Sequence, residues 1–124
     1  MRKTATAILF IIASFFIINN AYALNHKELQ YIKDRADKGN AKAEFVLGRL
    51  YFFGRGVSQN YSKAFFWFKK SAFMKNTSGE NALGFLYYHG KGVKRNYSKA
   101  AYWYKKSALQ GNPLSEFFLG SLYY

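Results

Sequence analysis

The chain has 124 residues, which is one small domain, and half of them are hydrophobic, which is enough for an ordered core. It contains no cysteine, so disulfides, thiolate metal sites and cysteine nucleophiles are excluded. The formal net charge of +13 predicts a surface that attracts polyanions.

The first segment predicts export. Arg2 and Lys3 precede an apolar run from about residue 5 to residue 18, and a small-x-small site ends at Ala23. This order is typical of a secretory signal peptide, here residues 1–23 with cleavage after Ala23. The alternative is a retained N-terminal anchor, although the run is shorter than the roughly 20 residues of a membrane span.

Both interpretations place the rest of the chain outside the cytoplasm, as a periplasmic or secreted protein or as a domain anchored facing the periplasm. Without Arg2 and Lys3 the formal charge falls by two, to +11. The polyanions outside the cytoplasm are anionic lipids, envelope polymers and acidic proteins, so nucleic acid is not an expected partner.

Residues 24–39 predict an N-terminal capping helix. Asn25 followed by Glu28 has the spacing of a capping box, in which each residue bonds the backbone of the other, and the helix is expected to continue through Lys38.

The chain then repeats with a period of 36 residues. Residues 40–75 and 76–111 are identical at 19 of 36 positions, and a third copy over residues 112–124 stops after its first helix. A fixed period of this size is typical of a solenoid, in which each unit packs on its neighbours.

Each unit predicts two helices. Asn40 is placed to cap a first helix over about residues 41–53, which ends at Gly54. Asn60 is placed to cap a second helix that reaches about Met74, and the second copy repeats these signals. The G-x-G-V segment between the helices has neither a preceding strand nor a third glycine, so it predicts a turn and not a phosphate-binding loop.

The pattern A-x-x-x-L-G-x-x-Y-x-x-G-x-G-V, followed by A-x-x-W-x-x-K-(S/A)-A, resembles the Sel1-like repeat, a relative of the tetratricopeptide repeat. The resemblance covers nearly all of residues 40–124. It implies an all-α fold, a right-handed α–α superhelix of antiparallel helix pairs, and a role in protein interaction. The departures are modest: Asn60 and Asn96 stand where the family usually has Asp, and Gly79 and Ser115 replace the Ala matched at Ala43.

Positions that recur between copies predict the core, among them Tyr51, Trp67 and the close-packed Gly48. A second stripe on the first helices differs at every position between copies, and the resemblance implies that it lines a concave groove. We expect this variable stripe to bind the partner; the alternative is a merely variable solvent face. Replacing Phe52 and Tyr88 by Ser is expected to abolish binding and leave melting unchanged. The variable stripe consists of Lys42, Phe45, Arg49, Phe52, Phe53, Ser78, Asn81, Phe85, Tyr88 and His89.

Six lysines recur one repeat apart on the second helices and form a basic stripe. One interpretation is a solvated outer face. The other is attraction to an anionic envelope surface. The basic stripe consists of Lys63, Lys69, Lys70, Lys99, Lys105 and Lys106.

Nothing in the sequence predicts catalysis, a metal site or a cofactor. Glu44, Glu80 and Glu116 occupy one first-turn position in three copies, where the helix dipole favours a carboxylate. His26 and His89 have no acidic or histidine neighbour at metal-ligand spacing.

The sequence therefore predicts an exported interaction module, not an enzyme, that docks a peptide or an acidic protein segment in the groove. The alternative is a structural envelope protein that binds anionic polymer or lipid through the basic stripe. The last helix raises a separate question, because no following helix covers its apolar residues; self-association, a truncated reading frame or a partner that completes the stack would each account for this. These residues are Phe117, Phe118, Leu119, Leu122 and Tyr123.

Overall fold

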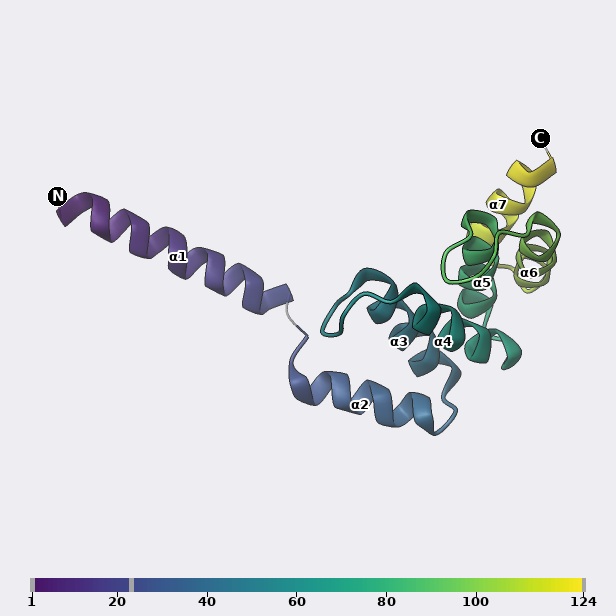
Figure 1. Cartoon of the computed structure of the whole chain (residues 1–124), viewed down its shortest axis with the longest axis horizontal. Helices are drawn as coiled ribbons and strands as arrows, with labels where there is room; N and C mark the ends of the chain where they lie inside the picture. The colour runs from purple at the N-terminus through teal and green to yellow at the C-terminus, as the bar shows by residue number, and fades with distance from the viewer. Residues whose placement is uncertain (1, 23, 124) are drawn as a thin grey trace.

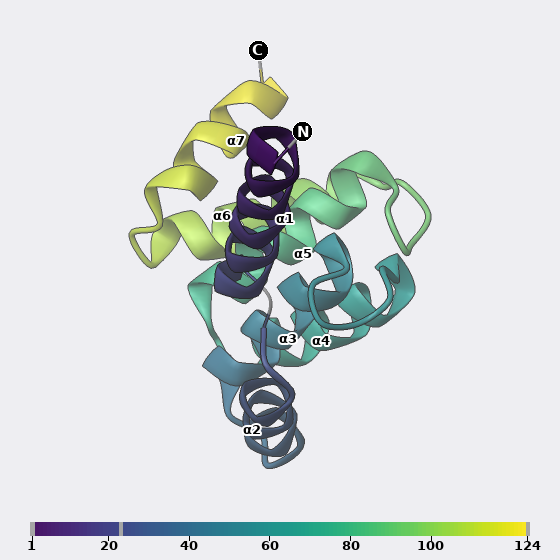
Figure 2. The ribbon, with the colours of Figure 1, turned by 90° about the vertical axis from the view of Figure 1, so that its left-hand side faces the viewer.

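The computed structural model describes residues 2–22 and 24–123, and every regular element in these ranges is an α-helix (Figure 1). From α2 onward each helix packs on the next, with α2 at one end of the stack and α7 at the other (Figure 2). The prediction of an all-α repeat solenoid is confirmed. The helices are α1 (Arg2–Tyr22), α2 (His26–Asp37), α3 (Ala41–Phe53), α4 (Tyr61–Phe73), α5 (Thr77–His89), α6 (Tyr97–Leu109) and α7 (Pro113–Tyr123).

Asparagine side chains start the helices where the sequence predicts. The side-chain oxygen of Asn40 accepts a hydrogen bond from the Ala43 amide at 2.9 Å, and Asn60 does the same for Lys63. The second copy repeats both caps. At the start of α2, Asn25 and Glu28 form the predicted capping box. These bonds satisfy amide groups that have no partner inside the helix.

The two helices of a unit approach closely because α3 and α5 carry a glycine at the crossing. A Cβ atom on Gly48 would lie 2.6 Å from Cδ1 of Phe68, and one on Gly84 would lie 2.9 Å from Cδ1 of Tyr104. Both distances are below van der Waals contact, so α4 and α6 pack where only glycine leaves room.

The turn between the helices is built identically in both copies. Gly54 and Gly90 end α3 and α5 with positive φ angles of 68° and 66°, the left-handed conformation that glycine favours. The turn then closes with a bond from the Asn60 amide to the Tyr51 carbonyl at 2.8 Å. The turns are therefore structural, as predicted.

Three apolar clusters run through the stack and contain the recurring residues. Trp103 is buried, and Trp67 is half-buried against the cluster that α2 and α3 share. Trp67 and Trp103 occupy the same position in their repeats, and each packs in the apolar core. Packing of the same side chain at the same place in each unit explains why these positions are identical between the copies.

The expectation that α7 leaves its apolar residues uncovered is wrong for three of five. Phe118, Leu119 and Leu122 pack on the α5–α6 cluster, and the ring of Phe118 stacks on Tyr104 with the centroids 5.3 Å apart. Phe117 is exposed, as is Tyr123. α6, the second helix of the preceding unit, covers one side of α7. This contact between units involves only the first helix of the later unit.

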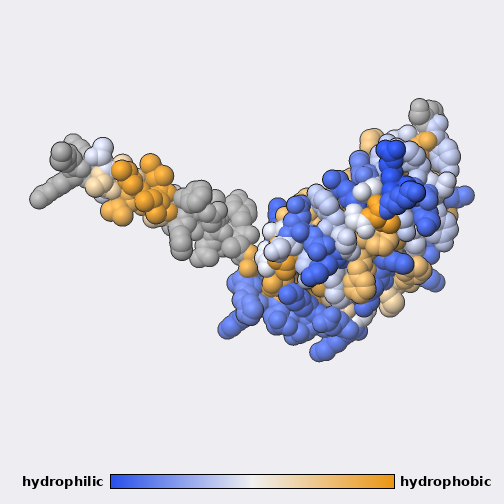
Figure 3. All heavy atoms as spheres, viewed as in Figure 1, coloured by the Kyte–Doolittle hydropathy of each residue, from blue (hydrophilic) through white to orange (hydrophobic). Residues whose placement is uncertain are grey.

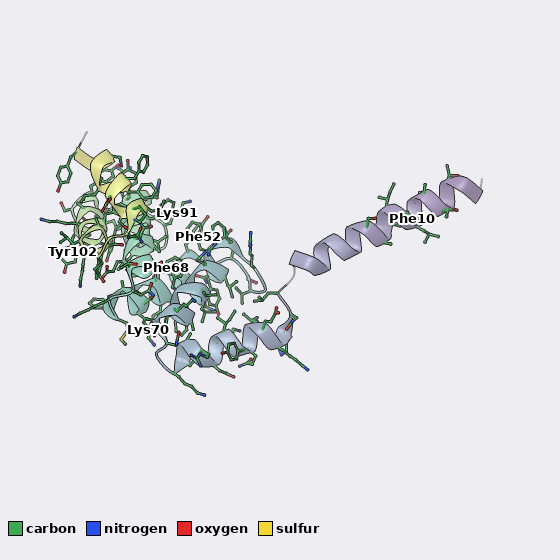
Figure 4. All side chains as sticks on the ribbon, turned by 180° about the vertical axis from the view of Figure 1, so that it is seen from behind. Phe10, Phe52, Phe68, Lys70, Lys91 and Tyr102 are labelled. Atoms are coloured by element: carbon green, nitrogen blue, oxygen red, sulfur yellow. The ribbon has the colours of Figure 1, made fainter. Side chains whose placement is uncertain are left out.

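α1 projects away from the stack, and its side chains that the structure describes, residues 4–14, are exposed (Figure 1). These side chains form an apolar surface, whereas the surface of the helix stack mixes hydrophilic and hydrophobic residues (Figure 3). Phe10 lies far from the other labelled residues (Figure 4). Among the described residues, no helix is both long enough and apolar enough to cross a membrane.

Candidate functional site

A hollow of about 250 Å³ lies where the first helices of the three units meet. We call it the groove. Most of its walls come from α3 and α5, and the start of α7 closes one end. Seven members of the variable stripe line it. The lining residues are Phe45, Arg49, Phe52, Phe53, Phe68, Ser78, Asn81, Ala82, Phe85, Leu86, Asn112 and Leu114.

Aromatic rings run continuously along this face from one unit to the next. Phe52 meets Phe53 at 4.9 Å between ring centroids and Phe85 at 6.0 Å. Phe85 in turn meets the ring of His89 at 4.2 Å. Edge and tilted contacts of this kind are favourable between aromatic rings, so the wall of the groove is apolar and ordered.

The polar side chains of the groove are one cation, Arg49, and the neutral Ser78, Asn81 and Asn112, which can both donate and accept hydrogen bonds. Arg49 is exposed, with its guanidinium carbon 5.9 Å from the centroid of Phe45. The side-chain amide of Asn81 donates to Ser115 Oγ at 2.8 Å, which ties α5 to α7. No Asp or Glu is among the residues that line the groove. The lining therefore suits apolar groups and anions.

Three members of the variable stripe lie outside the groove. Tyr88 and His89 line the next hollow along α5, together with Phe117. Lys42 lies at the α2 side of α3, in a hollow with Tyr31 and Arg35. The variable stripe is therefore one face with three hollows.

Sequence reasoning missed the contribution of the third copy. Leu114 follows Lys42 and Ser78 at the 36-residue period, and it lines the groove. By the same period Phe117 follows Phe45 and Asn81, and it lines the hollow beside Tyr88. Extending the variable stripe by one more period would have found both residues.

The expectation that Phe52 and Tyr88 can be replaced without loss of stability is wrong. Phe52 is half-buried against the cluster of Ala64, Phe68 and Leu86. Tyr88 is half-buried against the α5–α6 cluster. Both rings support the packing between units, so a serine at either position would remove apolar contacts.

Five of the six lysines of the basic stripe, all but Lys105, lie over aromatic rings. Lys63 Nζ is 5.3 Å from the Tyr51 ring centroid, and the equivalent Lys99 is 5.5 Å from Tyr87. Lys70 lies 5.1 Å from the Trp67 centroid. The stems of these lysines cover the aromatic core, and the ammonium groups gain cation–π contacts. The basic stripe thus has a packing role whether or not it binds anions.

The recurring glutamates are buried, which their first-turn position alone does not predict. Glu44 and Glu80 are at most 1% exposed, whereas Glu116 in the third copy is exposed. Burial raises the pKa of both buried carboxyls, and nearby Lys70 at Glu44 and Gln110 with Lys106 at Glu80 oppose the shift. Among the residues that the structure describes, no three His, Cys, Asp or Glu side chains are grouped to hold a metal ion.

Comparison with known proteins identifies relatives of this fold. The chain is 35% identical over 71 residues to the secretory immunoglobulin A-binding protein EsiB of Escherichia coli O6:H1, an alignment that covers 57% of this chain and 14% of EsiB. It is 38% identical over 48 residues to HRD3B, an ERAD-associated E3 ubiquitin-protein ligase component of Arabidopsis thaliana, covering 38% of this chain and 8% of HRD3B.

A solved structure agrees with these relatives. The crystal structure of a Sel1 repeat protein from Oxalobacter formigenes superposes with a TM-score of 0.75 at 30% identity, covering 77% of this chain and 28% of that one. The sequence profile described as Sel1 repeat matches residues 41–72 and 77–112, which is more than half of the chain. The chain belongs to the Sel1 repeat family.

Proposed function

We propose that this protein is an exported interaction module whose groove binds a peptide or an acidic segment of a partner protein. Sel1 repeat proteins are protein-interaction modules, and the family is a scaffold rather than an enzyme family. The groove supplies the more specific part of the proposal.

The observation that carries the proposal is the convergence of non-identical residues from three units on one hollow. α3, α5 and α7 each contribute side chains to the groove, and most of these side chains differ between the repeats. Most buried residues of the three clusters recur unchanged. A surface that recognises one partner needs a different side chain at each point along that partner, which is the pattern that the groove shows.

The composition of the groove favours the class of ligand. Apolar side chains of a peptide would fill the space between Phe53 and Phe85, and a carboxylate would pair with Arg49. The net charge of +13 would attract an acidic segment before contact is made.

The names of the relatives agree with partner binding. EsiB is named for binding secretory immunoglobulin A, and HRD3B is named as a component of a ligase complex. The chain spans only 14% and 8% of these proteins, so what transfers is protein binding as a class and not the identity of a partner.

Export is supported by α1. Its described side chains include the exposed Ile8, Leu9, Phe10, Ile11 and Ile12, which form no part of the three core clusters. An apolar helix behind Arg2 and Lys3 whose side chains are exposed over residues 4–14 is what a leader or an anchor requires.

The groove is tested with two aromatic residues that are matched in exposure. Phe53 lies in the groove and is 55% exposed, and Tyr102 lies outside it on α6 and is 58% exposed. Each makes one ring contact, with Phe52 and Trp103 respectively. Peptides selected from a random library on the immobilised protein serve as the probe, and their affinity for each variant is measured by calorimetry.

Phe53→Ser and Arg49→Glu are expected to weaken the selected peptides by about 30-fold, the effect of losing one central contact of about 2 kcal/mol. Tyr102→Ser is expected to leave the affinity unchanged, and all three variants should melt close to the parent protein. Equal loss in Phe53→Ser and Tyr102→Ser would remove the groove as the binding surface.

Export is tested by the mass of the protein recovered from its own cells. Loss of residues 1–23 from a fraction outside the cytoplasm supports a cleaved leader, and the intact mass in the membrane fraction supports the anchor. Recovery of the intact chain from the cytoplasm would contradict both.

A further inference from the structure

A second candidate site lies around Glu44, apart from the groove. Glu44 is 1% exposed, and its Oε2 atom has no hydrogen-bond partner. The nearest recorded cation is Lys70, whose Nζ is 3.9 Å from Oε1, a separation too long for a hydrogen bond. A buried carboxylate oxygen with no donor is unfavourable, so the position calls for a group that donates to it.

The second repeat shows which group fits. There the buried carboxylate of Glu80 accepts a hydrogen bond on Oε2 from the side-chain amide of Gln110 at 2.7 Å, while its Oε1 has no hydrogen-bond partner. Thirty-six residues before Gln110 the chain has Met74, whose thioether has no hydrogen to donate. The flanking lysines and the buried serine are identical in the two copies. The first repeat therefore keeps the acceptor and lacks the donor.

Space for the missing donor is open at the surface. A hollow of about 510 Å³ has Glu44 at its base, the exposed apolar side chains of Phe66, Phe73 and Met74 as walls, and Lys69 and Lys70 at the rim. We call it the Glu44 slot. Met74 and Lys70 line the slot together with Glu44, and both are long, unbranched and solvent-exposed, so they are able to turn aside.

The charges around the Glu44 slot select the type of donor. Lys69 and Lys70 already place two cations at the rim, so an incoming ammonium or guanidinium group would be repelled. A carboxylate cannot donate a hydrogen bond. A neutral primary amide carries no charge and can donate a hydrogen bond, and it is the group that the protein itself uses at Glu80.

We propose that the Glu44 slot binds the side-chain carboxamide of a glutamine or asparagine of a partner protein. The amide NH₂ donates to Oε2 of Glu44, and the methylene groups of the ligand pack on Phe66 and Phe73. This site is separate from the groove: Phe68 lies between Lys70 at the slot and Phe52 at the groove (Figure 4).

The test uses Met74→Gln, which places a glutamine at the position that Gln110 has in the second repeat. Its side-chain amide would donate to Glu44 and so compete with a bound ligand. The probe is N-acetylglutamine methylamide, titrated into the full-length protein and followed by the NMR signals of Glu44 and Phe66. The glutamate, lysine and norleucine analogues are titrated in parallel. Met74→Leu serves as the control, because it keeps the apolar wall and adds no donor.

The glutamine probe is expected to shift these signals saturably in the parent protein and in Met74→Leu, and to bind Met74→Gln at least about tenfold more weakly. Met74→Gln is also expected to melt higher than Met74→Leu and to lower the pKa of Glu44, because the carboxylate gains a donor. Phe53→Ser in the groove should leave probe binding unchanged, which separates this proposal from the proposed function.

Equal binding of the glutamate or norleucine analogue would overturn the carboxamide assignment, as would tighter binding of the lysine analogue. The absence of saturable shifts up to the solubility of the glutamine probe would overturn the site itself. Undiminished binding to Met74→Gln would show that the probe binds elsewhere.

Discussion

Replacing Gly48 by alanine adds one methyl group to the face of α3 that meets α4. The new Cβ would lie 2.6 Å and 2.7 Å from two ring carbons of Phe68, and the ring is 3% exposed, so any shift that relieves the overlap disturbs its buried contacts with Ala64 and Leu86. Overpacking of this kind costs about 1–3 kcal/mol. Alanine recovers up to about 1 kcal/mol because it is a better helix former than glycine. The expected net loss in the free energy of unfolding is about 1–2 kcal/mol.

The repeat supplies its own controls at the same position. At Gly84 the Cβ would lie 2.9 Å from two ring carbons of Tyr104, a smaller overlap, so Gly84→Ala should lose less than Gly48→Ala. At Gly120 in α7 a Cβ would meet nothing within 4 Å. Only the gain in helix propensity remains there, so Gly120→Ala should stabilise the protein by about 0.5 kcal/mol.

Urea unfolding followed by circular dichroism at 222 nm measures all three variants, with the midpoint and the slope fitted separately. The reasoning requires the order Gly48→Ala, Gly84→Ala, parent, Gly120→Ala from least to most stable. If Gly48→Ala were as stable as the parent protein, the close approach of α3 and α4 would be refuted as the reason for glycine at this position.

Further tests address the buried polar groups and the basic stripe. Ser71→Ala should lower the free energy of unfolding, measured in urea, by about 1 kcal/mol, because Ser71 Oγ donates a hydrogen bond to the Ala41 carbonyl at 2.7 Å. Ser62 is exposed, so Ser62→Ala should change the free energy of unfolding by less than about 0.5 kcal/mol. Burial raises the pKa of Glu44 and Glu80 above the usual 4.5. Above pH 4.5 the folded protein therefore binds more protons than the unfolded chain. The free energy of unfolding should then fall as the pH rises through the raised pKa values. Glu44→Gln and Glu80→Gln should flatten this fall and be more stable than the parent at pH 7; an unchanged pH profile would contradict the shifts. Binding to anionic phospholipid vesicles should decline steeply with added salt, because screening acts within about 8–10 Å, and salt-insensitive binding would exclude the basic stripe.

The helices could be predicted almost to the residue because the copies constrain one another. Asn40, Asn60 and Gly54 recur at a fixed period, and each has a structural role that only a helix end requires. A cap in one copy is weak evidence, but the same cap at the same position in two copies is not a coincidence. The structure accordingly has α3 and α4 with the predicted bounds.

The burial of the glutamates was not predicted, because a first-turn acid has a sufficient explanation in the helix dipole. The identity of Glu44, Glu80 and Glu116 contained the signal, because exposed positions of the first helices vary between the copies, as where Lys42 becomes Leu114 in the third copy. An acid that recurs where its solvent-facing neighbours change is held by contacts. Those contacts depend on the second helix of the unit, which is why Glu116 is exposed.

The groove could be predicted in part, because variation between copies identifies the face but not the depth of each side chain. Phe45 and Phe52 share that face with Arg49, and they are half-buried in the packing between units while Arg49 is exposed. The periodicity of one helix gives a direction for each side chain. How far a neighbouring helix covers that side chain depends on the distance between units, which the pattern does not contain.

The differences between the copies are of two kinds, and the distinction bears on the Glu44 slot. Where Phe68 becomes Tyr104, the facing glycine is kept and the ring remains buried, so the packing is preserved. Where Gln110 corresponds to Met74, the buried glutamate of the second repeat accepts one side-chain hydrogen bond and keeps one oxygen without a partner. The glutamate of the first repeat lacks that bond, although one substitution would provide the donor. Proteins tolerate a local loss of stability where it serves a function, and restoring stability there commonly reduces that function. Met74→Gln therefore separates two explanations. If Glu44 is unsatisfied only because this loss of stability is tolerated, the variant gains stability and binds the glutamine probe as the parent does. If the position is kept open for a partner, the gain in stability and the loss of binding appear together.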